Sequence, residues 1–300
     1  MYLGKLISVN EFRGIKRLAR EIEFPKITVL IGRNNSGKTA LLEALFILTS
    51  HDKRDFLKPR QSALSEFFPV GYSKLIYFYS GKAEILGIIK DKEVKVSIFE
   101  DNRIEPLSLD NPPETLYIDA QGILLSELGR YLREKENTIV KEGLHVKVAK
   151  TISKCVDEDY TELVLKQDGW YVRREDARYV RVEDLGSGAK KAIKIMLAAE
   201  LLKPKLILWD DFEVGMHPSL IRKTLEWLTQ GDWQAVISTH SIDVLYHLAD
   251  LSEEIEVDGK VILLRRENDV LLHKEITFDD LETLIDSNVD PRLLVAQLKL

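Results

Sequence analysis

The chain has 300 residues, of which 45% are hydrophobic and 31% charged, and its formal net charge is −6 at pH 7. This composition supports a sizeable core and excludes wholesale disorder; the acidic balance argues against a generally basic coat for nucleic acid. The single cysteine, Cys155, excludes an internal disulfide framework. No apolar run approaches the roughly 18 residues of a membrane span, and the N-terminus lacks a signal-peptide layout. We therefore expect a soluble cytoplasmic protein with no membrane partner.

The N-terminal part predicts strands that lead into a helix. Residues 3–9 alternate apolar and polar, as in a strand with one buried face. Residues 27–31, ITVLI, are a β-branched run typical of a buried parallel strand. A glycine-containing segment at 32–39 follows, and residues 40–50 have helical periodicity.

The middle of the chain predicts antiparallel strands and helices. Residues 72–105 have a strand-like period, which predicts hairpins with turns at 80–82 and 90–93. Further along, we predict a strand at 115–122, helices over 124–136 and 138–156, and a strand pair within 161–182.

The last third alternates buried strands with helices. In chain order we predict a helix over 189–203, a strand at 205–209, a helix over 218–230, a strand at 234–239, a helix over 240–251, a strand pair at 255–264 and 269–273, and one or two terminal helices. Buried strands that are each followed by a helix predict a parallel α/β sheet.

The segment GRNNSGKT at 32–39 matches the phosphate-loop pattern G-x-x-x-x-G-K-[ST] completely. It also stands between a predicted buried strand and a helix, which is the context that the motif requires. Backbone N–H groups of such a loop hold phosphate oxygens, Lys38 neutralises their charge and the Thr39 hydroxyl can ligate Mg²⁺. The nucleotide-binding residues predicted here are Arg33, Asn34, Asn35, Ser36, Gly37, Lys38, Thr39 and Ala40.

Acidic and imidazole groups follow two other predicted buried strands. Asp210 and Asp211 come directly after LILW at 206–209, and His240 follows QAVIST at 234–239. A P-loop ATPase needs an acidic Mg²⁺ partner at the end of a neighbouring strand. We predict that Asp210 supports Mg²⁺, that Asp211 orients or deprotonates the attacking water, and that His240 senses the γ-phosphate.

The chain resembles ABC-type ATPases, and most closely the RecF/SMC/OLD-like branch of AAA ATPases. The resemblance is carried by motifs at the two ends of the chain: NEFRGIK (10–16), GRNNSGKTALLEAL (32–45), LGSGAKKAI (185–193), LILWDDFEVGMHP (206–218) and STHS (238–241). It implies an α/β P-loop NTPase fold, an ABC-ATPase-like head, with an inserted antiparallel β and helical lobe. The expected domains are a core split over 1–50 and 183–265, the inserted lobe at 51–182 and a C-terminal extension at 266–300.

The resemblance implies that two heads dimerise head to tail around ATP and Mg²⁺. Ser187 and Gly188 would contact the γ-phosphate held by the partner head, and Gln121 would be the glutamine that links Mg²⁺ to the helical lobe, with Gln61 as a weaker rival. His217 fits the family's loop and is expected to be structural.

Two residues depart from the family pattern. Gly186 stands where the strict signature has serine, so that Ser187 lies one position later. Asp211 stands where the family usually has glutamate. Its carboxylate falls about 1.5 Å short of a glutamate's reach, roughly one C–C bond, and a displacement near 1 Å can cost on the order of a hundredfold in rate.

The resemblance favours an ATP-gated homodimer that hydrolyses ATP in DNA repair, genome maintenance or anti-phage defence. The alternative is a nucleotide-sensing module with negligible hydrolysis that signals to a partner effector. The stretch after Ser241 is too short for the Toprim nuclease domain of OLD-family proteins, so any nuclease is expected to be a separate partner. Basic clusters at 173–181 and 190–194 are either a DNA track or a solvated face with intramolecular ion pairs. A transporter subunit and a P-loop kinase fit the motifs less well.

Overall fold

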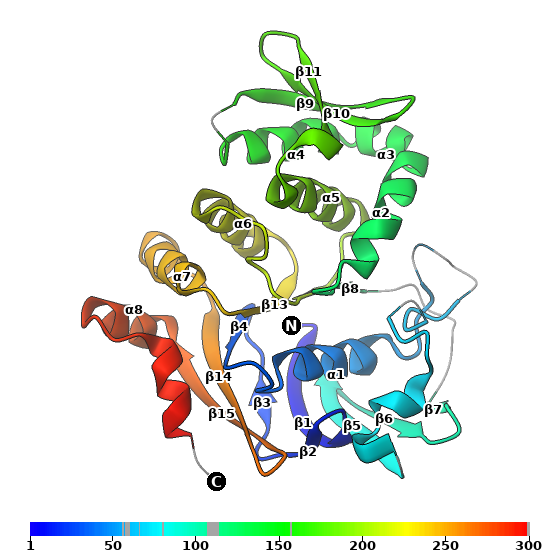
Figure 1. Cartoon of the computed structure of the whole chain (residues 1–300), viewed down its shortest axis with the longest axis vertical. Coiled ribbons are helices and arrows are strands. Elements are labelled where there is room, and N and C mark those ends of the chain that lie inside the picture. Colours follow the sequence, from blue (N-terminus) through cyan, green and yellow to red (C-terminus); the bar gives the residue numbers. More distant parts are fainter. Residues whose placement is uncertain are drawn as a thin grey trace. The chain divides into compact units, whose positions relative to one another are not determined.

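The computed structural model describes residues 1–55, 57, 61–65, 67–79, 81–106, 114–156 and 158–298. The chain groups into two compact units, each built from separate stretches (Figure 1). The first unit contains Met1–Ala120, Pro204–Phe212 and Asp232–Leu300, and the second contains Gln121–Lys203 and Glu213–Gly231. The chain therefore leaves and re-enters the first unit twice.

The first unit is built on one sheet, in which the described residues form twelve strands (Figure 1). The order across the sheet is β7-β6-β5-β1-β2-β15-β14-β4-β13-β12-β8, and β3 pairs with β1. The bounds are β1 (Leu3–Phe12), β2 (Ile15–Leu18), β3 (Ile22–Glu23), β4 (Ile27–Ile31), β5 (Lys82–Ile89), β6 (Lys92–Phe99), β7 (Ile104–Glu105), β8 (Thr115–Ile118), β12 (Leu206–Trp209), β13 (Gln234–Thr239), β14 (Gly259–Glu267) and β15 (Val270–Thr277).

The neighbouring strands β14, β4, β13, β12 and β8 are parallel to one another. Every residue of β4, β12 and β13 is buried. Short apolar strands of this kind are typical of parallel sheets covered on both faces. The predicted parallel α/β sheet is thus confirmed, and its carboxyl ends bring the loops after β4, β12 and β13 to one edge.

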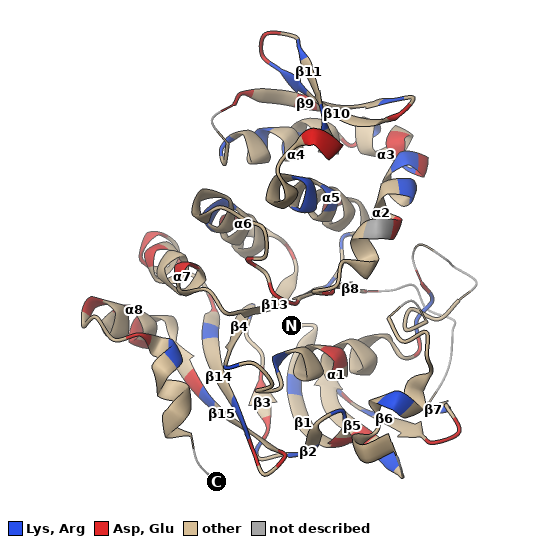
Figure 2. Cartoon of the chain, viewed as in Figure 1, with Lys and Arg blue, Asp and Glu red and all other residues tan. Residues whose placement is uncertain are grey.

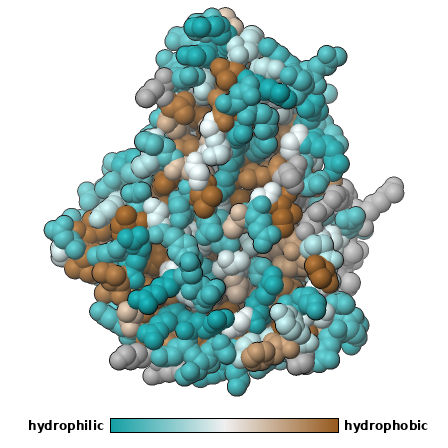
Figure 3. All heavy atoms as spheres, in the orientation of Figure 1, coloured by the Kyte–Doolittle hydropathy of each residue, from teal (hydrophilic) through white to brown (hydrophobic). Residues whose placement is uncertain are grey.

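The helices of the first unit pack on this sheet. They are α1 (Lys38–Ser50), α7 (Ile242–Glu254) and α8 (Phe278–Asp286), with 3-10 turns η1 (Tyr72–Leu75), η2 (Tyr77–Tyr79) and η4 (Pro291–Gln297). Helix α1 packs against β1, β5, β6, β8, β12 and β13, whereas α8 packs against β14 and β15. In the view of Figure 1, hydrophilic side chains cover most of the surface and apolar ones gather over α8 (Figure 3).

The second unit combines helices with a small antiparallel sheet. Its elements are α2 (Ile123–Glu134), α3 (Glu136–Lys141), α4 (Leu144–Ser153), β9 (Tyr160–Lys166), β10 (Gly169–Arg174), β11 (Tyr179–Arg181), η3 (Val182–Asp184), α5 (Ser187–Leu202) and α6 (Pro218–Gln230). Helix α4 packs against β9 and α5, and α2 also packs against α5. Buried residues such as Ile193 and Met196 place α5 in the core of this unit.

The predicted inserted lobe at 51–182 is divided between the two units. Strands β5 to β8 extend the sheet of the first unit, because β5 pairs with β1 along most of its length. Helices α2 to α4 and strands β9 to β11 belong to the second unit, together with α5 and α6. The contacts therefore group this stretch differently from the predicted boundaries.

The strand prediction was wrong for residues 72–79, which form η1 and η2 instead. Phe78 and Tyr79 have φ values of 50° and 61°, which lie outside the range of strands. The Tyr77 hydroxyl donates a 2.6 Å hydrogen bond to Asp269. A contact with a residue this distant in the sequence is absent from the local pattern on which the prediction rested.

The buried His273 of β15 is expected to make the fold sensitive to acid. Its side chain is 1% exposed, and its Nδ1 atom makes no hydrogen bond to any residue that the structure describes. Burial, with the nearby Arg20 charge, lowers the pKa of His273 from 6.5 to about 4. Because the folded pKa is depressed, the stabilising contribution is present above pH 6.5 and is lost as the pH falls toward 4.

Replacement of this imidazole should therefore reduce the acid sensitivity. When the pH falls from 7.5 to 4.5, the free energy of unfolding of His273→Phe should decrease by about 2 kcal/mol less than that of the parent. This effect follows from a difference of about two pKa units between the folded and the unfolded state. Urea unfolding at both pH values measures the difference. Equal losses in parent and variant would contradict the assignment.

Candidate nucleotide site

The glycine-containing loop at 32–37 connects β4 to α1, and two of its glycines are required by their surroundings. Gly37 has a φ of 102°, a value that side chains other than glycine rarely adopt. A Cβ atom on Gly32 would lie too close to the Ser36 side chain and to the carbonyl oxygen of Leu264. Arg33, Asn34 and Asn35 are exposed, and α1 begins at Lys38. The loop thus presents a helix N-terminus to solvent, an arrangement suited to anions.

The Lys38 ammonium is held across this loop. Its Nζ atom lies 3.0 Å from the carbonyl oxygen of Gly32 and 3.4 Å from that of Arg33. The residue is 5% exposed. The Ser36 hydroxyl is also buried, and it has no hydrogen-bond partner in the part of the chain that the structure describes. A cation and an unsatisfied hydroxyl inside the same loop suit an incoming phosphate oxygen.

Asp210 connects the loop to two neighbouring strands. Its Oδ2 atom accepts a 2.8 Å hydrogen bond from the Thr39 hydroxyl, and its Oδ1 atom accepts one of 2.5 Å from the Ser238 hydroxyl. Asp210 follows β12 and is 1% exposed, and its N–H donates to Ile118 in β8. Thr39 and Asp210, both of which are predicted to support Mg²⁺, are therefore in direct contact. Ser238 was missed, although a small polar residue within an apolar strand is a recognisable signal.

Asp211 and His240 follow β12 and β13, which are adjacent parallel strands. Asp211 has a φ of 46°, and its N–H donates to the Ser238 hydroxyl over 2.9 Å. The left-handed region suits aspartate better than most side chains. His240 is exposed, and its carbonyl oxygen accepts a 3.0 Å hydrogen bond from Arg292. The first unit thus places Lys38, Thr39, Asp210, Asp211 and His240 around the carboxyl ends of three neighbouring strands.

An ion pair beside the site accounts for the arginine of the segment FRG. Arg13 donates to both carboxylate oxygens of Glu43 in α1, over 2.7 and 2.6 Å. Burial raises the pKa of the Glu43 carboxyl; the Arg13 guanidinium opposes this shift and the charge of Asp210 adds to it. In the sequence, FRG indicated only the family. In the structure, Arg13 forms an ion pair with the helix that follows the loop.

Gln121, Ser187 and Gly188 belong to the second unit. Gln121 precedes α2, and Ser187 is exposed at the first position of α5. A Cβ atom on Gly188 would lie too close to the carbonyl oxygen of Gly215. The segments LGSG and GMHP, distant in sequence, therefore pack together within this unit. His217 caps α6 by accepting from the Ser219 N–H, in keeping with its predicted structural role.

Several residues of the basic clusters form ion pairs with acids in the same unit, and Figure 2 shows where basic and acidic residues lie along the ribbon. Arg178 lies 2.6 Å from Asp176 and Lys194 lies 2.9 Å from Glu183. Arg173, Arg174 and Arg181 have weaker pairs with Glu162, Glu158 and Asp168, at 3.5, 3.5 and 3.8 Å. Of the two interpretations that the sequence left open, the geometry favours intramolecular ion pairs.

The oxygen donors at Asp210 suit Mg²⁺. A hydroxyl and a carboxylate are hard ligands, and Mg²⁺ usually combines one or two such groups with waters and substrate phosphates. The described residues contain no cluster of three or more His, Cys, Asp or Glu side chains that could hold a metal. Thr39 and Asp210 supply one hydroxyl and one carboxylate, a donor set that fits a cation bound together with a nucleotide.

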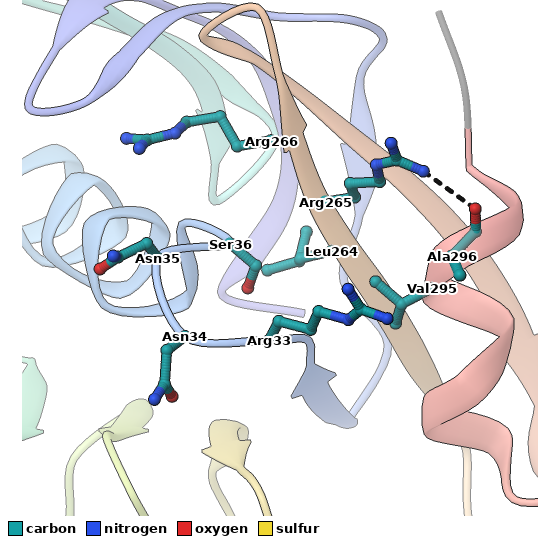
Figure 4. A pocket seen from close by; sticks show the side chains of 9 residues that line it. All are labelled: Arg33, Asn34, Asn35, Ser36, Leu264, Arg265, Arg266, Val295 and Ala296. Carbon is teal, nitrogen blue, oxygen red and sulfur yellow. Dashed lines mark hydrogen bonds between the residues drawn. The ribbon is translucent and has the colours of Figure 1, made fainter.

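A pocket of about 390 Å³ lies beside the loop (Figure 4). Loop residues 33–36 line it, as do Leu264, Arg265 and Arg266 of β14 and Val295 and Ala296 of η4. Figure 4 shows the Arg33 guanidinium extending from the loop toward Val295. The lining of this pocket, next to the phosphate loop, therefore combines arginine side chains with apolar ones.

The fold and this loop define a P-loop protein of the ABC-ATPase type. The family described as "AAA ATPase domain" matches residues 1–107, and the family described as "AAA domain, putative AbiEii toxin, Type IV TA system" matches residues 89–245. The second match spans more than half of the chain. The chain therefore belongs to this AAA family.

Two individual proteins are similar to the chain. The chain is 24% identical over 266 residues to the L-cystine import ATP-binding protein TcyC of Bacillus subtilis, covering 87% of this chain and 86% of TcyC. It is 27% identical over 104 residues to the uncharacterised protein MJECL11 of Methanocaldococcus jannaschii, covering 33% of this chain and 91% of that protein.

Solved structures show the fold. An SMC head bound to the C-winged helix domain of ScpA has a TM-score of 0.61 at 15% identity, covering 95% of this chain and all of that chain (100%). The SMC head domain of Thermotoga maritima has a TM-score of 0.53 at 14% identity, covering 92% of this chain and 99% of that one. None of the described helices is long and apolar enough to cross a membrane.

Proposed function

We propose that the protein is a Mg²⁺-dependent ATP hydrolase that works as an ATP-gated homodimer. The observation that carries this proposal is the network in which the buried Asp210 carboxylate accepts from Thr39 of the phosphate loop and from Ser238 of β13. This network supports the proposal, because it joins a buried carboxylate to the threonine that follows the loop lysine at the start of α1. Such an arrangement serves phosphoryl transfer, in which catalysis is mainly positioning and electrostatic stabilisation.

Each residue then has a separate role. Lys38 and the loop amides hold the β- and γ-phosphates, and Thr39 and Asp210 hold Mg²⁺, which neutralises charge that develops on the phosphates. Asp211 orients the attacking water and accepts its proton, and His240 contacts the γ-phosphate. Ser187 and Gly188 complete the site of a second copy, and Gln121 is the glutamine expected to respond to bound Mg²⁺. The exposure of Ser187 at the start of α5 supports this role between copies.

The pathway we propose is genome maintenance, DNA repair or anti-phage defence, with a separate effector or nuclease and DNA as candidate partners. The toxin named in the description of the matching family supports defence. The ScpA domain bound to one similar SMC head supports a protein partner. We expect the protein to act in the cytoplasm.

ATP turnover, measured with oligomeric state in parallel, tests the proposal. Purified protein with Mg²⁺ and ATP, alone or with single- or double-stranded DNA, should release phosphate and form dimers that disappear after hydrolysis. EDTA should abolish both effects. A protein that stays monomeric with ATP and releases no phosphate under any of these conditions would refute the hydrolase.

A second candidate function, a nucleotide sensor, is favoured by one observation, the shorter carboxylate of Asp211. The two functions differ in what Asp211→Glu does. If the protein is a hydrolase, we expect Asp211→Glu to cleave ATP several-fold more slowly in a single turnover. Glutamate in a left-handed conformation costs about 1 kcal/mol, and its longer side chain moves the carboxylate away from the position that aspartate gives it. A sensor would gain rate from the longer side chain.

Single-turnover cleavage of ATP by excess protein measures this difference without interference from product release. Asp211→Asn is the matched control, because it keeps the size of the side chain and removes the charge. The hydrolase should be nearly inactive with Asn, whereas a sensor should show the same negligible cleavage as its parent.

A further inference from the structure

The C-terminal segment Asp290–Leu298 is attached to the first unit at two separate places. It contains the 3-10 helix η4, whose start is capped by the Asp290 side chain. The Asp290 carboxylate also accepts from Nε and Nη2 of Arg292, over 3.0 and 2.7 Å. This pairing sets the direction of the guanidinium, and it raises the pKa of Arg292 further, together with Tyr246 and Asp243 of α7.

The first attachment reaches the histidine that follows β13. The remaining nitrogen, Nη1 of Arg292, donates a 3.0 Å hydrogen bond to the carbonyl oxygen of His240. His240 stands in the short turn between Thr239, which ends β13, and Ile242, which begins α7. Because a guanidinium is planar and rigid, its bond to Asp290 fixes where Nη1 can hold this carbonyl.

The second attachment reaches the pocket beside the phosphate loop. Nη1 of Arg265 donates to the carbonyl oxygens of Ala296 and Leu298, over 2.9 and 2.6 Å. Val295 is 3% exposed, and with Ala296 it lines the pocket on the side facing Arg33 (Figure 4). The same short segment therefore hydrogen-bonds the His240 turn through Arg292 at one end and lines the pocket beside the phosphate loop at the other.

We propose that Asp290–Leu298 couples the phosphate-loop pocket to the His240 turn, with Arg292 as a positioning residue for His240. The role of His240 itself rests on the proposed function. A ligand that displaces Val295 or Ala296 moves η4, and the Arg292 guanidinium passes that movement to the His240 carbonyl. When the pocket wall is undisturbed, the same bond holds the turn in one conformation.

A matched pair elsewhere in the chain separates this role from a local ion pair. Asp176 and Arg178 have the same spacing. Arg178 likewise donates from its backbone N–H and from Nε to the Asp176 carboxylate, over 3.0 and 2.8 Å. Within the described part of the chain, the Arg178 side chain contacts no residue of the site. Arg178→Ala therefore removes an equivalent pair without touching the His240 carbonyl.

Hydrogen exchange of the ligand-free protein tests the attachment without any assumption about activity. In Arg292→Ala we expect amides 241–244 to exchange about tenfold faster or more, as loss of a charged hydrogen bond implies, whereas Arg178→Ala leaves them unchanged. Arg292→Lys should restore part of the protection, because lysine keeps a donor and loses the rigid fork. Unchanged exchange in Arg292→Ala, or faster exchange throughout the unit, would overturn the attachment.

Kinetics test the positioning role. In Arg292→Ala we expect kcat to fall about tenfold or more while KM for ATP changes less than about threefold, since a misplaced group of about 1 Å can cost a hundredfold. Parent-like kcat would overturn that role. If the parent protein itself hydrolysed no ATP, the proposed function would fail, and the exchange data alone would decide whether η4 anchors the turn.

Discussion

Lys38→Ala is expected to lower ATP turnover at least about a hundredfold. The ammonium lies within a loop whose carbonyl oxygens at Gly32 and Arg33 already hold it in place. It therefore needs little rearrangement to meet the β- and γ-phosphates. Removal of one such preorganised electrostatic group typically costs on the order of 10²- to 10³-fold in rate.

The measurement is steady-state phosphate release with saturating Mg²⁺ and ATP. Lys38→Arg is a useful second variant because it keeps the positive charge. Its bulkier guanidinium does not fit the space around residue 38, where the lysine is only 5% exposed. The control is Lys92→Ala in β6, an exposed lysine in the first unit. Turnover of Lys38→Ala at the parent rate would mean that the loop does not act on ATP.

The parts of the fold that the sequence predicted are those with a local physical signal. The runs ITVLI, LILW and QAVIST are wholly buried strands in the structure, because short β-branched and apolar runs suit a sheet covered on both faces. The loop at 32–39 was equally recognisable, since its glycines adopt a backbone conformation or a close approach that few other residues allow. Long-range contacts carry no such local signal.

The features that were missed depend on residues far apart in the chain. Residues 72–79 leave the predicted strand in a region where the Tyr77 hydroxyl bonds the distant Asp269. Ser238 joins Asp210 only because β13 lies next to β12 in the sheet. Arg292 meets the His240 carbonyl although no motif connects them. In each case a polar group acts through tertiary geometry, which periodicity and spacing do not encode.

The Asp210 carboxylate is the common element of the candidate site. It accepts from Thr39 after β4 and from Ser238 in β13, while its own N–H bonds β8. One buried residue, through its side chain and its backbone N–H, thus connects the start of α1 to β13 and β8. Under the proposed function the same two oxygens also support Mg²⁺, so that this residue would serve both the order of the site and its chemistry.

Asp210→Asn is therefore expected to lower ATP turnover at least about a hundredfold and to weaken the site. The asparagine amide has one acceptor oxygen, so one of the two hydroxyl groups loses its acceptor and faces an NH₂ donor. A buried polar group left without a partner costs about 1–3 kcal/mol, which urea unfolding would detect. Ser238→Ala is the comparison, since it leaves the Asp210 carboxylate intact while removing the hydroxyl that donates to Asp210 and accepts from the Asp211 N–H. It should lower turnover less than Asp210→Asn does.

The dependence on Mg²⁺ separates a metal role from a purely structural one. ATP affinity of the parent and of Ser238→Ala should rise when Mg²⁺ replaces EDTA, whereas the affinity of Asp210→Asn should respond much less. Binding of a fluorescent ATP analogue measures this without turnover. If Asp210→Asn kept the full Mg²⁺ response while losing stability, Asp210 would only hold Thr39 and Ser238 in place, and the metal would have to be supported by another oxygen of the site.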